Sequence, residues 1–333
     1  MKYSIVLPVR NGGEYVKECV YSVLSQTLNN FNLHVLDNCS TDETLEWIGS
    51  LKDDRIKVFS SEKPLTIEEN WARAVSIPKN EFLTIIGHDD VLARNYLSVM
   101  DELISKHPDA SLYQTHFSYI DSKGKKIGDC KHMKEIETDK NFLTSVLTKN
   151  IDIMGTGFMM RSKDYDALGG IPAYPNLLFA DFELWLNLTR ISYKATSLQN
   201  CFSFRLHQST TAVSPDVKLH KAFEQFIYFL QSLSKKDKSL NETIRKYAEH
   251  FILVHCKGLS HRLLRTPISK RDNLSVKIFI EKCKFLADLL VPDNKFQPDL
   301  VFSIWLAKLL DSNSIGRNLF LIFKKVYSKP LLK

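Results

Sequence analysis

Short apolar segments alternate with amphipathic ones along the first 90 residues of this chain, and no other feature limits its fold as strongly. The apolar segments, which predict buried strands, are residues 3–9, 32–38, 56–60 and 81–87. Between them, the spacing of apolar residues predicts helices over residues 14–24 and 67–77, the second ending before Pro78. A further helix is expected after Ser40 or Thr41, either of which can cap it. Strands and helices that alternate at this spacing predict a parallel α/β sheet.

The pattern changes after about residue 110. Extended segments are predicted at residues 111–121, 154–161 and 193–206, and helices at residues 140–149 and 181–191. These elements indicate a mixed second half of the same domain. From about residue 217 to 327 the apolar spacing is helical throughout. We therefore expect an α/β domain over residues 1–215 and a basic helical region over residues 216–333.

The charge of the chain is unevenly distributed. The 333 residues carry a formal net charge of +7, but residues 216–333 contain 22 Lys and Arg against 11 Asp and Glu. The first 215 residues contain 23 and 27, which makes that part mildly acidic. Basic helices favour anionic surfaces such as phospholipid headgroups, nucleic acid or pyrophosphate-linked substrates. The alternative interpretation is a solvated helical face without a partner.

The spacing of the cysteines and the lack of long apolar runs indicate in which cellular compartment the protein works. The six cysteines show no CxxC spacing, which argues against a zinc site or a disulfide framework and fits a reducing environment. The first residues are too short an apolar run for a signal peptide, and no run approaches the roughly 20 residues that span a bilayer. We expect a cytoplasmic protein, soluble or peripherally attached to a membrane.

Polar clusters follow three of the predicted strands at the point where each strand ends. They cover residues 8–13, 37–42 and 88–90. Ligands of open α/β sheets bind beyond the carboxyl ends of the strands, so these clusters predict a nucleotide site. The adjacent carboxylates of Asp89 and Asp90 repel each other unless a cation lies beside them. Oxygen ligands completed by phosphates suit Mg²⁺ or Mn²⁺.

Six segments, in the same order along the chain, resemble glycosyltransferase family 2. They are SIVLPVRNGGEYVKECVYSVLSQTL, VLDNCSTDET, NEFLTIIGHDDVL, GTGFMMRSKDYDALGGI, ADFELWLNLT and FRLHQSTTA. The resemblance implies a GT-A fold, with a Rossmann-like nucleotide-binding half, a mixed acceptor half and a mostly parallel central sheet. It also implies an inverting transfer from a nucleotide-sugar donor that depends on a divalent cation.

The resemblance assigns roles to residues at the strand ends. Six of them would bind the donor nucleotide: Pro8, Val9, Asn11, Asp37, Asp42 and His88. Asp89 would hold Mn²⁺ or Mg²⁺ with Asp90 beside it, and Arg205 and His207 would hold the pyrophosphate or the metal. Gly87 stands where the family's DxD motif has its first acid. The metal would therefore be held by Asp89 and phosphates alone, or with help from Asp90 and His88.

Asp181 is the expected general base for the acceptor hydroxyl, with Glu183 as second choice. Ala180 stands where many relatives have Glu. One carboxylate is sufficient for an in-line displacement with inversion. Because Asp181 opens a predicted helix, we expect the helix dipole to keep the pKa of its carboxyl low. The alternative is that Asp181 only caps that helix.

These features together predict an enzyme that transfers one sugar from a UDP-, dTDP- or GDP-sugar to a hydroxyl of a glycan or lipid-linked glycan. The expected setting is the synthesis of bacterial surface polysaccharide, such as O-antigen or capsule. Two alternatives are a polyprenyl-phosphate sugar synthase and a non-catalytic nucleotide-sugar-binding scaffold. The aromatic and basic segment at residues 318–333 can lie in a membrane interface, or the helical region can pack against the first domain or a second subunit.

Overall fold

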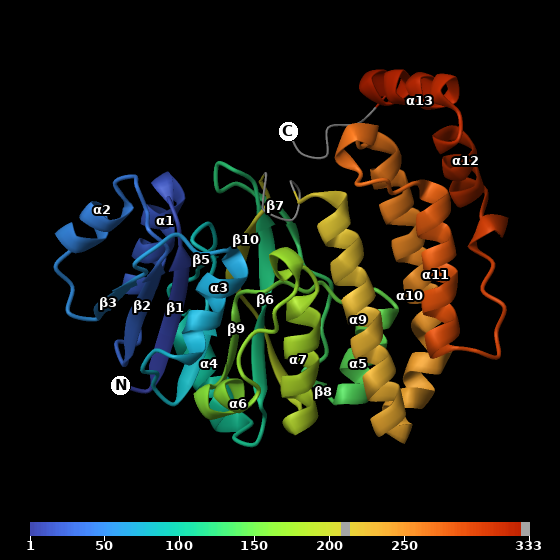
Figure 1. Cartoon of the computed structure of the whole chain (residues 1–333). Helices are drawn as coiled ribbons and strands as arrows, with labels where there is room; N and C mark the ends of the chain where they lie inside the picture. Colours follow the sequence, from blue (N-terminus) through green and yellow to red (C-terminus); the bar gives the residue numbers. More distant parts are fainter. Residues whose placement is uncertain (208–213, 328–333) are drawn as a thin grey trace. The chain divides into compact units, whose positions relative to one another are not determined.

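The structure, a computed structural model, describes residues 1–207 and 214–327 (Figure 1). The chain divides into two compact units, residues 1–142 with 150–209 and residues 143–149 with 210–333. The first unit is an α/β domain and the second is helical. Residues 143–149, at the end of helix α5 (Asp139–Leu147), belong to the helical unit, whereas the sequence pattern places them in the α/β domain.

The first unit is built on a ten-stranded sheet. Its strands are β1 (Tyr3–Val9), β2 (Phe31–Asp37), β3 (Ile56–Ser60), β4 (Phe82–Ile85), β5 (Val91–Leu92), β6 (Leu112–Ile120), β7 (Lys126–Asp129), β8 (Ile136–Glu137), β9 (Phe158–Arg161) and β10 (Lys194–Arg205). The order across the sheet is β3-β2-β1-β4-β9-β6-β10-β5, with β7 paired to β6 and β8 to β10. The four predicted strands of the first 90 residues thus lie side by side.

Strand direction brings distant segments to one edge of this sheet. Strands β3, β2, β1 and β4 are parallel. Strand β9 runs antiparallel to both β4 and β6, so β6 has the direction of β4, and β10 is parallel to β6. The carboxyl ends of β1, β2, β4, β6 and β10 therefore meet at the same edge. The predicted mostly parallel α/β sheet with a mixed second half is confirmed.

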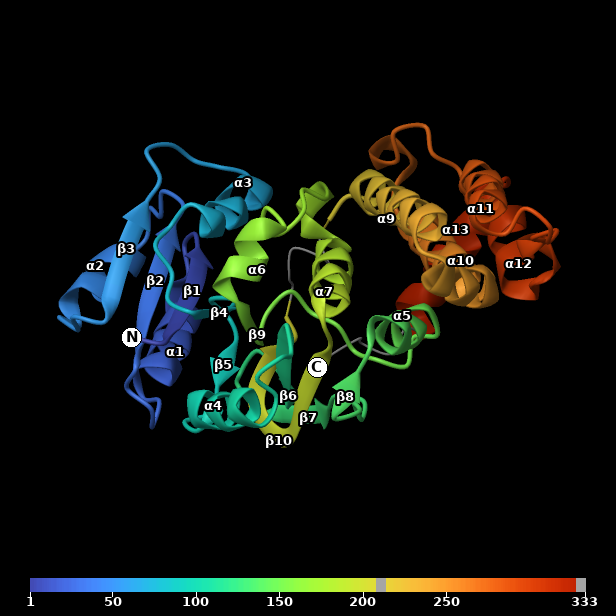
Figure 2. The same cartoon turned by 90° about the horizontal axis from the view of Figure 1, so that it is seen from below.

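Helices cover both faces of the sheet. They are α1 (Gly13–Leu24), α2 (Thr44–Ser50), α3 (Ile67–Ala72), α4 (Tyr96–Lys106), α6 (Ser162–Ala167) and α7 (Ala180–Ile191). Figure 2 shows α1 and α4 on one face and α3, α6 and α7 on the other. On the second face Trp185 of α7 stacks on Phe158 with ring centroids 4.3 Å apart. This packing orients α7 against the sheet.

The extended segment predicted at residues 154–161 is a strand only from Phe158 onward. Gly157 has a φ of +77°, in the region that glycine adopts most readily. A Cβ at this position would lie 2.8 Å from the Phe202 ring. The close approach of Gly157 to Phe202 requires glycine, and residues 150–157 leave the sheet to form a loop on its edge.

The second unit contains five long helices. They are α9 (Asp216–Lys236), α10 (Lys238–Arg265), α11 (Val276–Leu290), α12 (Phe302–Asp311) and α13 (Ser314–Tyr327). Asp237 separates the first two, because its carboxylate accepts the N–H groups of Ser239 and Leu240 and caps α10. The buried pair of Arg271 and Asp311, 2.5 Å apart, fixes the end of α12. In the described part of the chain, no helix has both the length and the apolar character needed to cross a membrane.

Candidate active site

The loops after β1 and β2 are joined by the side chain of Asn11. Its backbone N–H donates to the Ser40 hydroxyl over 2.9 Å, and its side-chain oxygen accepts the N–H of Thr41 over 2.7 Å. Asn11 has a φ of +51°, a conformation that Asn tolerates better than most residues. The two loops therefore form one surface at the edge of the sheet, and Asn11 determines its shape.

Asp42 connects the starts of α1 and α2. Its carboxylate accepts the N–H of Gly13 and the N–H of Thr44, each over 3.1 Å. Helix α2 begins at Thr44, so the prediction that Ser40 or Thr41 caps it was wrong. The reason is that the Ser40 hydroxyl is already bound to Asn11. Asp42 is exposed but already engaged with backbone donors, which suits a residue that holds the loops in place.

Asp37 lies at the end of β2 and is only 1% exposed. In the described residues its carboxylate accepts only the N–H of Ser40, at 3.2 and 3.4 Å from its two oxygens. Its backbone carbonyl accepts Arg73, whose guanidinium also binds the carbonyl of Phe59. Pro8 and Val9, on the neighbouring strand, are buried beside it. A buried carboxylate with such weak partners can accept further hydrogen bonds from a ligand.

Asp90 is buried and fully engaged. Its two carboxylate oxygens accept the Thr156 hydroxyl over 2.7 Å and the backbone N–H of Arg205 over 3.0 Å. Burial raises the pKa of the Asp90 carboxyl well above its ordinary range, and the neighbouring charge of Asp89 adds to the increase. Asp90 therefore holds the loop after β4 against the end of β10, and only 1% of it is exposed.

Asp89 points the other way and is accessible. Its Oδ2 atom lies 2.5 Å from Nε2 of His207, and both side chains are about a fifth exposed, 23% and 22%. His207 lies two residues after the end of β10, and its ring lies against Tyr15 of α1 with centroids 5.3 Å apart. The parallel direction of β4 and β10 thus brings together two residues that are 118 positions apart.

Gly87, in the position of the missing acid, lies close to the carboxylates of the two acids that follow it. A Cβ there would lie 2.7 Å from an oxygen of Asp89 and 3.1 Å from one of Asp90. An aspartate at this position would therefore require the ends of these two side chains to shift.

Arg205 is placed within the site with its guanidinium buried. It is 2% exposed, and its guanidinium donates to the carbonyls of Asp89 and Asp121 and to the carboxylate of Glu18. Its charge also lies 4.8 Å from the ring of Tyr15. The bond to the carbonyl of Asp89 ties Arg205 to the loop after β4, and the other contacts tie it to α1 and to the end of β6.

His88 lies between the two parts of the site. Burial lowers the pKa of its imidazole, and the charges of Asp89, His207 and Asp42 also act on it. A lowered pKa keeps His88 neutral at pH 7. It then has one ring nitrogen that donates and one that accepts, which suits a contact with a sugar or a nucleotide.

Asp181 lies in the first turn of α7, two residues after Phe179, which has a left-handed conformation. Burial raises the pKa of its carboxyl from 3.8 to about 7, although part of the residue stays accessible. The N–H of Phe182 donates to it over 3.0 Å and opposes the increase. The expectation that the helix dipole keeps this pKa low was wrong, because desolvation outweighs the dipole.

Glu183, the second choice for the base, is occupied. The hydroxyl of the buried Tyr174 donates to its carboxylate over 2.5 Å. Burial also raises the pKa of the Glu183 carboxyl, and the hydrogen bond from Tyr174 offsets part of this increase. Of the two carboxylates at the start of α7, Asp181 is the one that accepts no hydrogen bond from another side chain in the described residues.

The loop at residues 150–157 connects α7 to the acidic pair. Trp185 donates its indole N–H to the carbonyl of Met154 over 3.0 Å, and Thr156 donates to Asp90. Met154 and Thr156 of one loop thus connect α7 to the end of β4. Thr156 was not identified from the sequence, nor were Tyr15 and Glu18. Tyr15 and Glu18 lie on α1, whose first turns adjoin the polar edge of the sheet. Their place directly after the first polar cluster could have indicated them.

No group of three or more His, Cys, Asp or Glu in residues 1–207 and 214–327 could hold a metal ion alone. Asp89 and His207 together offer an accessible carboxylate and an imidazole. These two groups fit a divalent cation that takes its other ligands from phosphate oxygens and water. Asp90 is less accessible than Asp89, and both its oxygens accept hydrogen bonds from the protein.

The fold agrees with solved structures. The chain resembles S. aureus TarS residues 1–349 in complex with UDP, with a TM-score of 0.63 and 16% identity over 99% of this chain and 93% of that one. The same TarS segment in complex with UDP-GlcNAc gives a TM-score of 0.61 and 15% identity over the same shares of the two chains. These likenesses show a GT-A fold, as predicted.

Sequence comparison defines the family. The family model described as glycosyl transferase family 2 matches residues 4–169. The glycosyltransferase GlyG of Streptococcus pneumoniae serotype 4 is 27% identical over 123 residues, which are 36% of this chain and 41% of GlyG. An uncharacterized glycosyltransferase of Haemophilus influenzae is 26% identical over 191 residues, 55% of this chain and 70% of that protein. The chain belongs to glycosyltransferase family 2, and it aligns with less than half of the length of GlyG.

Proposed function

We propose that the chain transfers one sugar from a nucleotide-sugar donor to a hydroxyl of a glycan or lipid-linked glycan, with inversion at the anomeric carbon. The observation that carries the proposal is the convergence at one sheet edge of the underbonded Asp37 and the Asp89–His207 pair. Binding of UDP and UDP-GlcNAc by TarS, which has the same fold, supports a uridine nucleotide as donor. The dTDP- and GDP-sugars are the other candidates.

In this proposal the strand-end loops bind the nucleotide. Asp37 accepts hydrogen bonds from the base, and Pro8 and Val9 form the apolar wall beside it. Asn11 and Asp42 keep the two loops in register through their contacts with the backbone. His88, neutral at pH 7, contacts the donor further along the edge.

The leaving diphosphate carries negative charge that must be neutralised. A divalent cation, Mn²⁺ or Mg²⁺, would be held by Asp89 and His207 and would stabilise that charge. Arg205 keeps the carbonyl of Asp89 in position, and Asp90 fixes the same loop from its buried side. The protein thus orients one accessible carboxylate and one imidazole toward the phosphates.

Asp181 takes the proton of the acceptor hydroxyl. A general base is most effective when its pKa lies near the working pH, and the carboxyl of Asp181 has a pKa of about 7. A phosphate acceptor, as in a polyprenyl-phosphate sugar synthase, needs no such base. The raised pKa of Asp181 therefore favours a hydroxyl acceptor.

We expect the transfer rate to depend on pH through Asp181. Only the ionised carboxylate accepts a proton, so the rate should rise about tenfold per pH unit below a pKa of about 7 and then level off. The measurement is turnover at saturating donor and acceptor across this range. The residual activity of Asp181→Asn is the control and should lack this slope. A wild-type rate that does not change from acid to neutral pH would contradict the assignment.

Biologically, the proposed setting is the synthesis of bacterial surface polysaccharide, with the chain in the cytoplasm or at the cytoplasmic face of the membrane. A lipid-linked acceptor would bring the enzyme to that surface. The acceptor sugar and the linkage are identified by analysing the product, because the residues of the donor site do not contact them in this proposal.

Thermal stabilisation by nucleotide sugars tests the proposal. A ligand that binds only the folded state raises its apparent stability, so UDP-, dTDP- and GDP-sugars are compared in the presence of Mn²⁺. The best donor is then incubated with glycan acceptors, and the anomeric configuration of the product is determined. Stabilisation without any hydrolysis or transfer would indicate a binding scaffold instead. Transfer to a polyprenyl phosphate but to no hydroxyl would indicate the synthase.

Substituting Asp37 tests the nucleotide pocket. We expect Asp37→Ala to weaken binding of the nucleoside diphosphate about 10–100-fold, because hydrogen bonds to a charged group are lost. Calorimetric titration measures the affinity, and Asp53→Ala, which removes a carboxylate paired with Arg55 outside the site, is the matched control. Unchanged affinity together with a lower melting temperature would show that Asp37 only supports the loop.

A further inference from the structure

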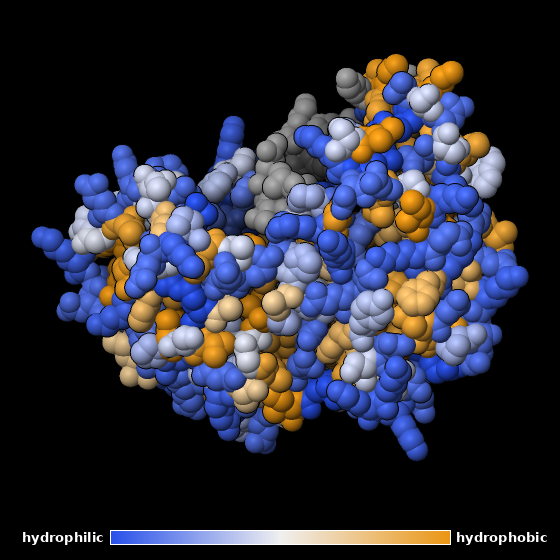
Figure 3. All heavy atoms as spheres, in the orientation of Figure 1, coloured by the Kyte–Doolittle hydropathy of each residue, from blue (hydrophilic) through white to orange (hydrophobic). Residues whose placement is uncertain are grey.

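Helix α13 has an exposed apolar stripe. The stripe consists of Ile315, Leu319, Ile322, Phe323 and Val326, which are between 52% and 70% exposed. Their spacing places them on one side of the helix. The opposite side includes Arg317, which is buried and donates to the carbonyls of Leu264 and Thr266. The stripe is therefore directed away from the helical unit. Figure 3 shows hydrophobic residues gathered over α13 at the upper right.

The preceding helix, α12, adds exposed aromatic residues. Phe302 and Trp305 are 69% and 47% exposed, and their rings stack with centroids 5.8 Å apart. Leu309, one turn further, is also exposed. Single exposed apolar residues are common, but two adjoining helices with eight of them are not. We call these eight side chains the α12–α13 surface.

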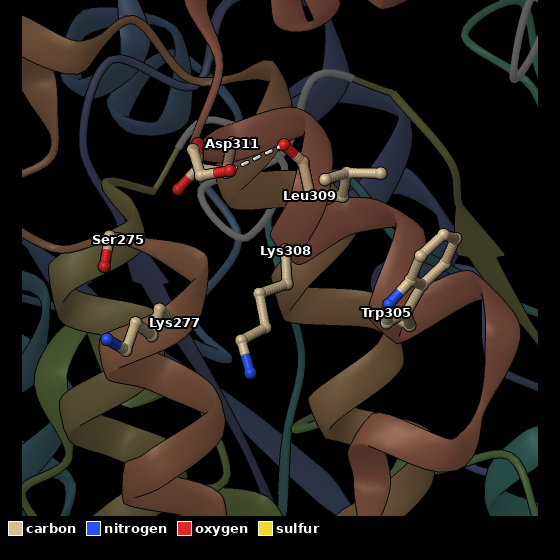
Figure 4. Close-up of a pocket in the computed structure, with 7 residues that line it drawn as sticks. Ser275, Lys277, Trp305, Lys308, Leu309 and Asp311 are labelled. Carbon is tan, nitrogen blue, oxygen red and sulfur yellow. Dashed lines mark hydrogen bonds between the residues drawn. The ribbon is translucent and has the colours of Figure 1, made fainter.

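Positive charge borders this surface. Trp305 and Leu309 line a cavity of about 370 Å³ together with Lys277 and Lys308 (Figure 4). Lys308 is paired with Asp299, whereas Lys277 has no carboxylate partner in the part of the chain that the structure describes. Residues 312–333 contain five Lys or Arg and no Asp or Glu. Two of these, Lys329 and Lys333, lie outside the described residues.

We propose that the α12–α13 surface docks on an anionic lipid bilayer. An exposed apolar stripe bordered by lysines lies in the plane of a membrane interface, with its apolar side chains among the acyl chains. Tryptophan is favoured at that depth because its ring is apolar and its N–H is polar. Basic residues beside the stripe attract anionic headgroups, and the cavity at Lys277 can receive one phosphate.

Charge distinguishes a lipid from a second copy of the chain. Two copies paired through this surface would bring their cationic segments together, with no acidic residue after Asp311 to balance them. Like charges facing each other disfavour such an interface. Anionic lipid supplies the opposite charge. The docking does not depend on the proposed sugar transfer, because it needs neither donor nor acceptor. The surface also extends beyond the C-terminal segment that the sequence indicates, since it includes α12.

Vesicle sedimentation with the full chain tests the proposal. We expect binding to vesicles of phosphatidylcholine with phosphatidylglycerol, little binding to phosphatidylcholine alone, and weaker binding as salt increases. Trp305 should report insertion by a blue shift of its fluorescence. Trp305→Phe should keep most of the binding and lose that part of the shift.

Two exposed residues of the stripe provide the decisive variant. The double substitution Leu319→Ser and Ile322→Ser should lower vesicle binding about tenfold or more, because two buried apolar side chains are lost. Leu198→Ser, at an exposed leucine of β10 in the α/β unit, is the matched control and should change nothing. If the double variant is less stable, Val326→Ser repeats the test at the end of the stripe. Donor hydrolysis should be unchanged in all of them, which separates this test from that of the proposed function.

Three results would overturn the proposal. The first is no binding to anionic vesicles at low salt. The second is equal binding to neutral and anionic vesicles, or an equal loss in the Leu198→Ser control. The third is a dimer, measured by sedimentation equilibrium without lipid, that the double variant abolishes. That result would assign the surface to a second copy of the chain.

Discussion

Replacing Asp181 by asparagine should reduce the rate of sugar transfer by about 10²–10⁴-fold, the usual effect of losing a general base. Asparagine keeps the shape of the side chain but cannot accept the proton. The affinity for the donor should stay near that of the unchanged protein, because the residues proposed to bind the nucleotide follow β1, β2 and β4. Single-turnover kinetics measures the chemical step, and calorimetry measures donor binding.

The same substitution should stabilise the protein above pH 7. The carboxyl of Asp181 has a pKa of about 7 in the folded chain against 3.8 ordinarily. The folded state thus holds the proton more tightly, and its stability falls as pH rises from about 4 to about 7. Each pKa unit is worth about 1.4 kcal/mol, so removing the ionised group should recover on the order of 4 kcal/mol at pH 8 and nothing below about pH 4.

Glu183→Gln is the matched control, since Glu183 lies in the same turn but is bonded to Tyr174. It should leave the pH dependence of transfer in place. If Asp181 were only a helix cap, asparagine would serve as well, and both rate and stability would stay near normal. Near-normal transfer by Asp181→Asn, or a product with retained configuration, would contradict the proposed mechanism without affecting the fold.

The sheet edge could be predicted because it depends on local patterns. Four apolar segments, each followed by polar residues, indicate where parallel strands end. The contact of Asp89 with His207 could not be derived in that way. It depends on the antiparallel strand β9, which lies between β4 and β6 and leaves β10 pointing in the same direction as β4. Resemblance to a family indicated both residues, but only the topology pairs them.

Burial explains where the interpretation of single residues was incomplete. Arg205 was expected to hold the pyrophosphate or the metal, and its guanidinium is enclosed among Glu18, Tyr15 and two carbonyls. For Asp181 the sequence shows the start of a helix, whose dipole lowers the pKa of the carboxyl. It does not show the residues that bury this carboxyl, and their effect, which raises the pKa, is larger. Both cases depend on which side chains enclose a charge, and those side chains come from segments far apart in the sequence.

Replacing Asp89 by asparagine should reduce transfer by on the order of 10²–10³-fold, because the charge that stabilises the leaving diphosphate is worth several kcal/mol. EDTA should have a similar effect on the wild type, and added Mn²⁺ should restore the wild type but not the variant. Asp89 is accessible and its neighbours are held by Arg205 and Asp90, so the melting temperature should change little.

The variant Asp90→Asn is the informative comparison. Its carboxyl is buried between Thr156 and Arg205, so this variant should lower stability while its remaining activity still responds to Mn²⁺. Full activity of Asp89→Asn, or of the wild type in EDTA, would contradict a role for the metal. The contact between Asp89 and His207 would then be a hydrogen bond without a metal-binding function.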